Sequence, residues 1–167
     1  MFAFVALAFT LLVTVASAST LPKRQAGTQV WQSPFTGTIT APAADTAVEP
    51  GTPFAFAYTR NNWCQSSYSP FTVYATQGEA PPSFANVTTD GRLAEGTYVQ
   101  EMGTFVVSNF GLPLNGGIAP PSTMTVTAAP TEGQQTYVVV LQEYDSCPGG
   151  IAKEFSLTSV PIALSDA

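Results

Sequence analysis

The chain has 167 residues, the length of one domain, and 45% of them are hydrophobic while only 10% are charged. Its 11 acidic and five basic side chains give a net charge of −6, which excludes binding to nucleic acids or anionic membranes through a basic surface. The absence of histidine excludes Ser-His-Asp and Cys-His catalytic systems and histidine-ligated zinc or copper. The sequence suggests no cofactor and no metal.

The first residues predict secretion. Residues 2–14 form an uncharged apolar run that is too short to span a bilayer as a stable helix. The small residues Ala16-Ser17-Ala18 follow it and are typical of the cleavage site of a secretory signal peptide. We therefore predict a signal peptide over residues 1–18, with a membrane anchor as the alternative.

A short pro-segment is predicted over residues 19–24. It ends in Lys23-Arg24, a dibasic pair that resembles the sites cut by fungal Golgi processing proteases. The mature chain then begins at Gln25 and forms a single domain over residues 25–167. The alternative is that residues 19–24 remain as an unprocessed tail.

The mature chain is expected to be an extracellular glycoprotein. Asn86-Val87-Thr88 is a glycosylation sequon, which in a secreted chain predicts a sugar on Asn86 in an exposed loop. The C-terminal residues lack the long apolar tail of a lipid-anchor signal. We therefore expect release from the cell and no membrane partner after signal cleavage.

Short alternating runs of apolar and polar residues, without helical periodicity, predict an all-β domain. In the clearest run, Pro53–Arg60, the aromatic side chains of Phe54, Phe56 and Tyr58 share one face. The run Thr136–Tyr144 is apolar on both faces, which indicates a central strand. The seven expected strands cover residues 35–40, 53–60, 71–76, 98–107, 123–127, 136–144 and 155–157.

Seven strands joined by turn-rich segments favour an immunoglobulin-like two-sheet β-sandwich, with a small barrel as the alternative. Most prolines, Pro70 among them, are expected between the strands because proline lacks an amide hydrogen. Gly103 is predicted to mark a β-bulge. Residues 77–96 and 108–121 form long connections, where binding commonly resides.

The two cysteines are predicted to form a disulfide in an oxidising compartment. Cys64 lies four residues beyond the run that ends at Arg60, and Cys147 lies three residues beyond the run that ends at Tyr144. If successive strands alternate in direction, the second and sixth strands end at the same end of the sandwich. The cysteines that follow them can therefore meet without distortion.

The residues around Cys64 form a candidate ligand-binding surface. Asn61, Asn62, Trp63 and Tyr68 combine flat apolar rings with amide donors, and Tyr144 ends the strand that leads to the facing loop. Such a surface suits sugar rings, whose C–H faces are apolar and whose rims are hydroxylated. The alternative is that Trp63 covers the end of the core and shields the disulfide.

Two carboxylates are candidates for catalysis. Glu143 and Asp145 are spaced two residues apart on a predicted strand and so share a face, as the acid and base of a glycosidase or the ligands of a calcium ion would. Solvated charges at a strand end are the favoured interpretation. The other acidic residues show no metal-ligand spacing.

Five segments of the chain form a recognisable pattern: Ile39-Thr-Ala-Pro, Val48-Glu-Pro-Gly51, Phe54-Ala-Phe-Ala-Tyr58, Trp63-Cys64-Gln-Ser-Ser-Tyr68 and Phe71-Thr-Val73. Over residues 38–160 the pattern resembles a group of uncharacterised small secreted proteins of mushroom-forming fungi. The resemblance implies a secreted β-domain and brings no catalytic residues. The spacing is also distantly similar to the immunoglobulin-like domain of fungal cell-wall-synthesis proteins.

The expected function is that of a secreted, non-enzymatic protein of the cell surface or extracellular matrix. The first alternative is a carbohydrate-binding module that recognises a cell-wall polysaccharide. The second is a small glycoside hydrolase that depends on carboxylates. The sequence does not indicate the oligomeric state.

Overall fold

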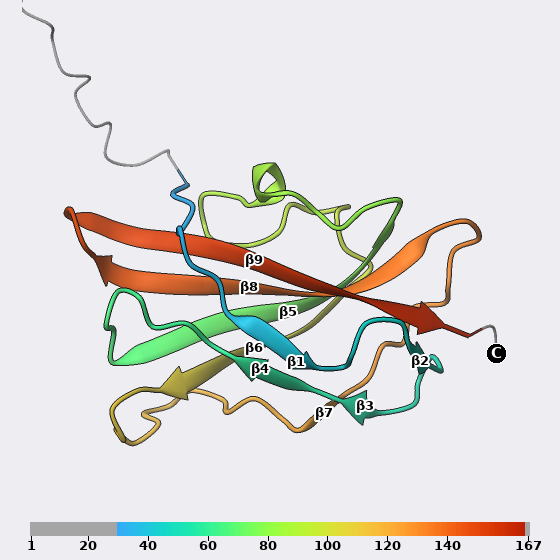
Figure 1. Ribbon diagram of the computed structural model, residues 1–167, viewed down its shortest axis with the longest axis horizontal. Helices are drawn as coiled ribbons and strands as arrows, with labels where there is room; N and C mark the ends of the chain where they lie inside the picture. The colour runs from blue at the N-terminus through green and yellow to red at the C-terminus, as the bar shows by residue number, and fades with distance from the viewer. Residues whose placement is uncertain (1–29, 166–167) are drawn as a thin grey trace, which may run out of the picture.

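The computed structural model describes residues 30–165, without the side chains of residues 151 and 152. The predicted signal peptide, pro-segment and Gln25 lie outside the described residues. The described part is built from strands and one short 3₁₀ helix, which confirms the all-β prediction (Figure 1). The elements are β1 (Thr38–Ala41), β2 (Thr46–Val48), β3 (Phe54–Ala55), β4 (Ala57–Thr59), β5 (Tyr68–Gly78), η1 (Phe84–Asn86), β6 (Gln100–Ser108), β7 (Thr123–Met124), β8 (Gln135–Cys147) and β9 (Ile151–Leu164).

The larger sheet has five strands in the order β2-β9-β8-β5-β6. Neighbouring strands run antiparallel, except that β2 pairs in parallel with the last residues of β9. β8 lies at the centre, where Val140 is opposite Val73 of β5 and Thr158 of β9. The apolar run Thr136–Tyr144, which was predicted to be a central strand, therefore lies in the central strand of the sheet.

A smaller layer faces this sheet. β1 pairs with β4, and β3 pairs with β7, both antiparallel. β3 and β4 are halves of one extended segment that is interrupted at Phe56, whose N–H donates to the carbonyl of Ser122 at 2.9 Å. Apolar side chains of the two layers pack into a common core, as in a sandwich. This core includes Phe54, Phe56, Phe71, Val73, Phe105, Val126, Val138, Val140 and Ile162.

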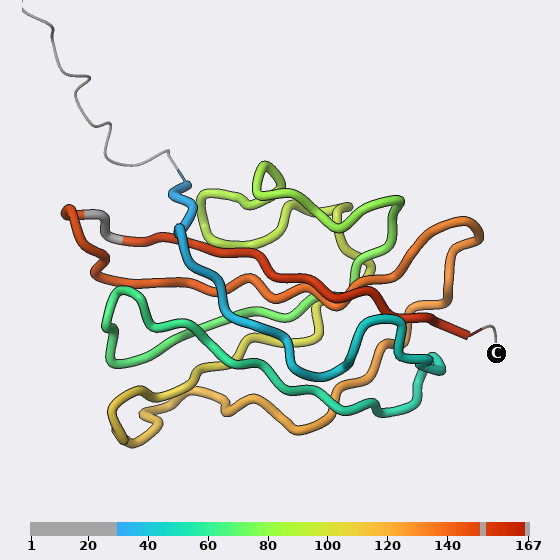
Figure 2. Tube along the Cα trace, viewed as in Figure 1, coloured from blue at the N-terminus to red at the C-terminus, as the bar shows by residue number. Residues whose placement is uncertain are grey.

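A second core covers the outer face of the larger sheet. Residues 79–99, which connect β5 to β6, fold back over that face, and residues 30–33 run along β9 through a bridge between Gln32 and Phe155 (Figure 2). Gly91 lies so close to Phe155 that a Cβ atom would stand 2.5 Å from its ring. This core includes Tyr74, Val87, Leu93, Val139, Leu141 and Phe155. The long connection predicted at residues 77–96 therefore contributes buried side chains to this core.

Several predicted strand boundaries are wrong. The run 53–60 is interrupted at Phe56, where the segment changes its partner from β7 to β1. The run 123–127 pairs as a strand only over Thr123–Met124, whereas the run 155–157 is the middle of the much longer β9. β2 was not predicted, because three residues are too few to show an alternating pattern.

The bulge at Gly103 is confirmed, since Val73 pairs with Gly103 while Tyr74 pairs with Glu101. Pro70 lies inside β5 and not between strands. It is tolerated there because pairing between β5 and β8 begins only at Phe71.

Candidate functional site

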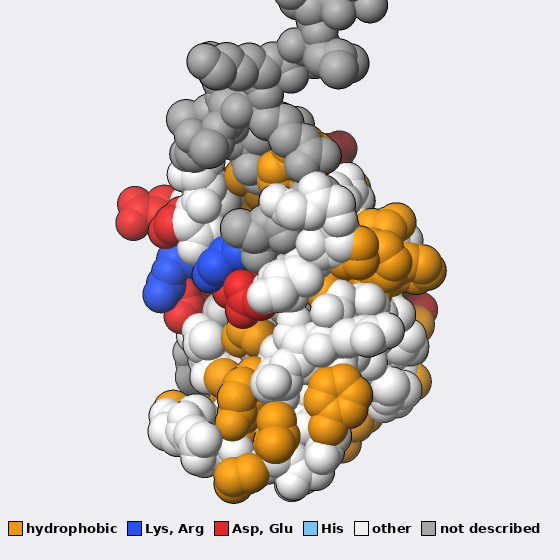
Figure 3. All heavy atoms as spheres, turned by 90° about the vertical axis from the view of Figure 1, so that its left-hand side faces the viewer, with side chains coloured by type: hydrophobic (Ala, Val, Ile, Leu, Met, Phe, Trp, Pro, Cys, Tyr) orange, Lys and Arg blue, Asp and Glu red, His pale blue; other side chains and the backbone are white. Residues whose placement is uncertain are grey.

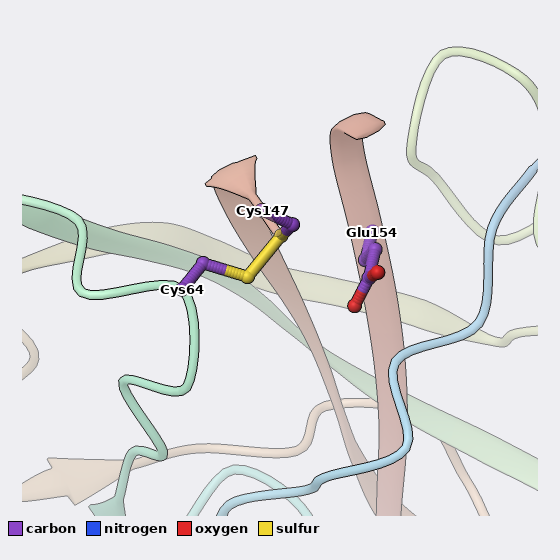
Figure 4. A group of neighbouring side chains, drawn as sticks. All are labelled: Cys64, Cys147 and Glu154. Atoms are coloured by element: carbon purple, nitrogen blue, oxygen red, sulfur yellow. A yellow bond between two sulfur atoms is a disulfide. The ribbon is translucent and has the colours of Figure 1, made fainter. Parts of the chain in front are cut away.

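The Cys64–Cys147 disulfide ties the 60–67 loop to the last residue of β8, with the two Cα atoms 4.5 Å apart (Figure 4). This confirms the predicted pairing, although Cys147 ends the strand and does not lie beyond it. We call the end of the sandwich formed by the 60–67 loop, the β8–β9 turn and the start of the β6–β7 connection the disulfide end. It lies on the left in Figure 1.

The inner face of β8 changes from apolar to polar toward the disulfide end. Gln142 is fully buried. Its Oε1 accepts hydrogen bonds from the Tyr58 hydroxyl at 2.7 Å and from the N–H of Asn61 at 3.3 Å, and its Nε2 donates to the Asn61 carbonyl at 2.6 Å. Burial, with a smaller contribution from Tyr144, raises the pKa of Tyr58, so its hydroxyl stays protonated as a donor. These bonds fix the start of the 60–67 loop against the larger sheet.

The amide of Asn62 is used inside the loop. Its Oδ1 accepts from the N–H of Ser66 at 3.0 Å, and its Nδ2 donates to the Ser66 carbonyl at 3.2 Å. The Ser66 hydroxyl donates to the carbonyl of Asp145 on β8 at 2.6 Å. Asn62 therefore shapes the loop, whereas the side-chain amide of Asn61 makes no hydrogen bond within the described part of the chain.

Trp63 is fixed in orientation by a buried carboxylate. Its indole Nε1–H donates to Oε2 of Glu154 at 3.0 Å, and only 4% of Glu154 is exposed. The indole also contacts the ring of Phe35, with ring centroids 5.1 Å apart and planes tilted by 42°. Phe35 is 46% exposed, so the two rings form an aromatic pair that reaches the surface.

Glu154 also lies beside the disulfide, with a carboxylate oxygen and both sulfur atoms within 4.8 Å of one another (Figure 4). Because the sulfurs are bonded to each other, they offer no thiolate ligands and the group does not form a metal centre. Sequence reasoning missed Glu154 as part of this site. Its register opposite Tyr144 places it here, and pairing of β8 with β9 is not visible in the local sequence.

Tyr144 and Tyr68, the remaining residues of the predicted surface, have different environments. Tyr144 is 2% exposed, and its hydroxyl donates to the Phe35 carbonyl at 3.1 Å. Burial raises its pKa. Tyr68 is half-buried, donates to the carbonyl of Pro113 at 3.1 Å and accepts from Nδ2 of Asn115 at 3.2 Å. The hydroxyl of Tyr144 therefore holds the backbone of Phe35, whereas Tyr68 contacts the β6–β7 connection.

The carboxylates considered for catalysis lie on β8. Glu143 Oε1 forms an ion pair with the Nζ of Lys153 at 2.6 Å. Hydrogen bonding to Glu143 raises the pKa of Lys153, to which the charge of Asp145 also contributes. Figure 3, which looks at the disulfide end, shows acidic and basic side chains close together on this face. Glu143 is thus engaged with a cation.

The sequon lies at η1. Asn86 is half-buried, and its Oδ1 accepts from the N–H of Ser83 at 3.0 Å and from the Ser83 hydroxyl at 3.3 Å. Its Nδ2, the atom that would carry a glycan, makes no hydrogen bond to the residues that the structure describes.

Comparisons with models of protein families, with curated proteins and with solved structures find no match. Among residues 30–165, no helix is long and apolar enough to cross a bilayer. The interpretation of the site therefore depends on its own geometry.

Replacing Trp63 by Phe tests the contact with Glu154. We expect the free energy of unfolding to fall by about 1.5–3 kcal/mol, because the buried carboxylate loses a donor. Urea denaturation of the wild type, Trp63→Phe, Glu154→Leu and the double variant gives the coupling between the two residues, because leucine has no acceptor for the indole N–H. Strictly additive effects would contradict the interaction.

Proposed function

We propose that the protein is a secreted, non-enzymatic component of the cell surface or extracellular matrix, built as an immunoglobulin-like sandwich. The observation that carries the proposal is the Cys64–Cys147 bond, since disulfides persist in oxidising, extracellular environments. The apolar run at residues 2–14 supplies the signal for export.

The strand order supports the immunoglobulin-like assignment. β9, β8, β5 and β6 are neighbours in one sheet, while β1, the 54–59 segment and β7 make the facing layer. In immunoglobulin-like sandwiches the third, sixth and seventh strands lie in one sheet, and β5, β8 and β9 occupy the corresponding places here. The disulfide differs from that of antibody domains, which links the interiors of two strands. Here it links the 60–67 loop to the last residue of β8.

The polar groups of the candidate site support a role without catalysis. Glu143 is paired with Lys153, and Glu154 holds the indole of Trp63. A glycosidase needs one carboxyl group as an acid and a second as a base or nucleophile at the scissile bond. Of the predicted pair Glu143 and Asp145, Glu143 is bound to Lys153, and the charge of Asp145 also acts on that lysine.

Expression in a eukaryotic host tests the proposal of secretion. We expect the protein in the medium to have an intact mass that corresponds to residues 25–167 plus a glycan. Enzymatic deglycosylation should lower the mass of the wild type and leave that of Asn86→Gln unchanged. Retention of the protein inside the cell, or a chain that begins at residue 1, would contradict the proposal.

A second candidate function is binding of a cell-wall polysaccharide, and the aromatic pair of Trp63 and Phe35 specifically favours it. The Glu154 hydrogen bond fixes the indole, so little side-chain entropy is lost when a ligand stacks on the pair. The free side-chain amide of Asn61, two residues before Trp63 in the chain, offers hydrogen bonds to hydroxyl groups. These features match the mixed apolar and hydroxylated surface of a sugar.

Retention on insoluble chitin, β-glucan and cellulose tests this candidate. We expect the mature protein to be retained by at least one polymer, and Trp63→Ala to lose retention while circular dichroism shows the fold intact. Val99→Ala is the matched control, because Val99 is as exposed as Phe35 but precedes β6 at the opposite end. Absence of retention on every polymer would reject the carbohydrate-binding function.

A further inference from the structure

An uncharged apolar surface lies at the disulfide end, on the connection from β6 to β7. Phe110 is 73% exposed, Leu112 38% and Ile118 68%. These are three of the five large hydrophobic side chains that are exposed among the described residues. Residues 109–122 include no charged side chain. In Figure 3, hydrophobic side chains gather on the lower part of the disulfide end, away from the acidic and basic groups.

The connection is held in place at both ends. Asn109 is 1% exposed; its Oδ1 accepts from the Arg60 guanidinium, and its Nδ2 donates to the Ser66 carbonyl at 2.7 Å and to the Ser69 hydroxyl at 2.9 Å. Farther along, the carbonyl of Ile118 accepts from the N–H of Val106 on the edge of β6 at 2.9 Å. These hydrogen bonds hold the backbone that carries the exposed side chains of Phe110, Leu112 and Ile118.

Phe110 has an unusual backbone conformation, with φ at +56°. A bulky residue in this left-handed region is strained by its Cβ atom, a strain that glycine avoids and asparagine reduces. With 73% of its surface exposed, the ring recovers little of this cost by burial. Strain of this kind is concentrated at binding sites, where it presents a side chain to a ligand.

The same connection also carries hydrogen-bonding groups. Tyr68 contacts Pro113 and Asn115 through its hydroxyl. The Oδ1 of the exposed Asn115 has no partner within the described residues, so it is free to accept a bond from a hydroxyl group. An exposed ring, a phenol and a free amide oxygen without any charge suit a neutral saccharide, whereas an anionic lipid would require basic side chains.

We propose that Phe110, Tyr68 and Asn115 form a second saccharide subsite, so that the protein binds an extended, uncharged polysaccharide across the disulfide end. The inference depends on the proposed carbohydrate-binding function. Hydrogen bonds from Asn109 to Ser66 and from Ser66 to Asp145 connect the second subsite to the 60–67 loop that carries Trp63. A polymer that contacts both surfaces binds more tightly than a short sugar that contacts one.

Calorimetric titration of the mature glycoprotein with disaccharides and hexasaccharides of chitin, β-glucan and cellulose tests the inference. We expect the hexasaccharide of the recognised polymer to bind at least tenfold more tightly than the disaccharide. Phe110→Asn should weaken hexasaccharide binding about tenfold, the equivalent of about 1.4 kcal/mol, and leave disaccharide binding unchanged. Asparagine is chosen because it tolerates the left-handed backbone, and Val99→Ala is the control.

Two results would overturn the inference and leave the carbohydrate-binding function in place. One is wild-type affinity in Phe110→Asn together with loss of binding in Trp63→Ala. The other is a wild-type dimer in sedimentation that becomes a monomer in Phe110→Asn, which would make the loop a protein interface. If no polymer or oligosaccharide binds the wild type, the proposed binding function itself is rejected, and the second subsite with it.

Discussion

The bond between Cys64 and Cys147 is the constraint on which the candidate site depends. It holds the 60–67 loop, which passes from the smaller layer to the larger sheet, against the end of the central strand. Buried hydrogen bonds to Gln142 and Asn109 complete the attachment, because few apolar side chains of the loop reach the core. Without the disulfide and these hydrogen bonds, the 60–67 loop would move, and the ring of Trp63 would move with it.

The disulfide end separates polar groups that stabilise the protein from rings that face solvent. Hydrogen bonds made by these polar groups fix the surface: Glu154 binds the indole of Trp63, Asn109 holds the start of the β6–β7 connection, and Tyr144 binds the carbonyl of Phe35. The groups that remain outward are the Trp63–Phe35 pair and Phe110, together with the side-chain amide of Asn61 and the Oδ1 of Asn115. The exposed rings are therefore held in a fixed shape, at an end of the sandwich that also carries the ion pair of Glu143 and Lys153.

The sequence predicts those features that depend on local pattern. Alternation along Pro53–Arg60 identifies its buried face, the doubly apolar run Thr136–Tyr144 identifies the central strand, and Gly103 identifies the bulge. The disulfide follows from strand direction and cysteine count. Features that depend on distant partners were not predictable, such as the covering of the outer sheet face by residues 79–99 and the contact of Glu154 with Trp63.

Replacement of both Cys64 and Cys147 by Ser, followed by thermal unfolding, tests the central claim most directly. The chain-entropy model assigns about 4–5 kcal/mol to a cross-link between residues 83 apart. Because both cores remain apolar, we expect the melting temperature to fall by on the order of 10 °C or more while the β-sheet signal in circular dichroism persists. An unchanged melting temperature, or free thiols in the native protein, would contradict the account.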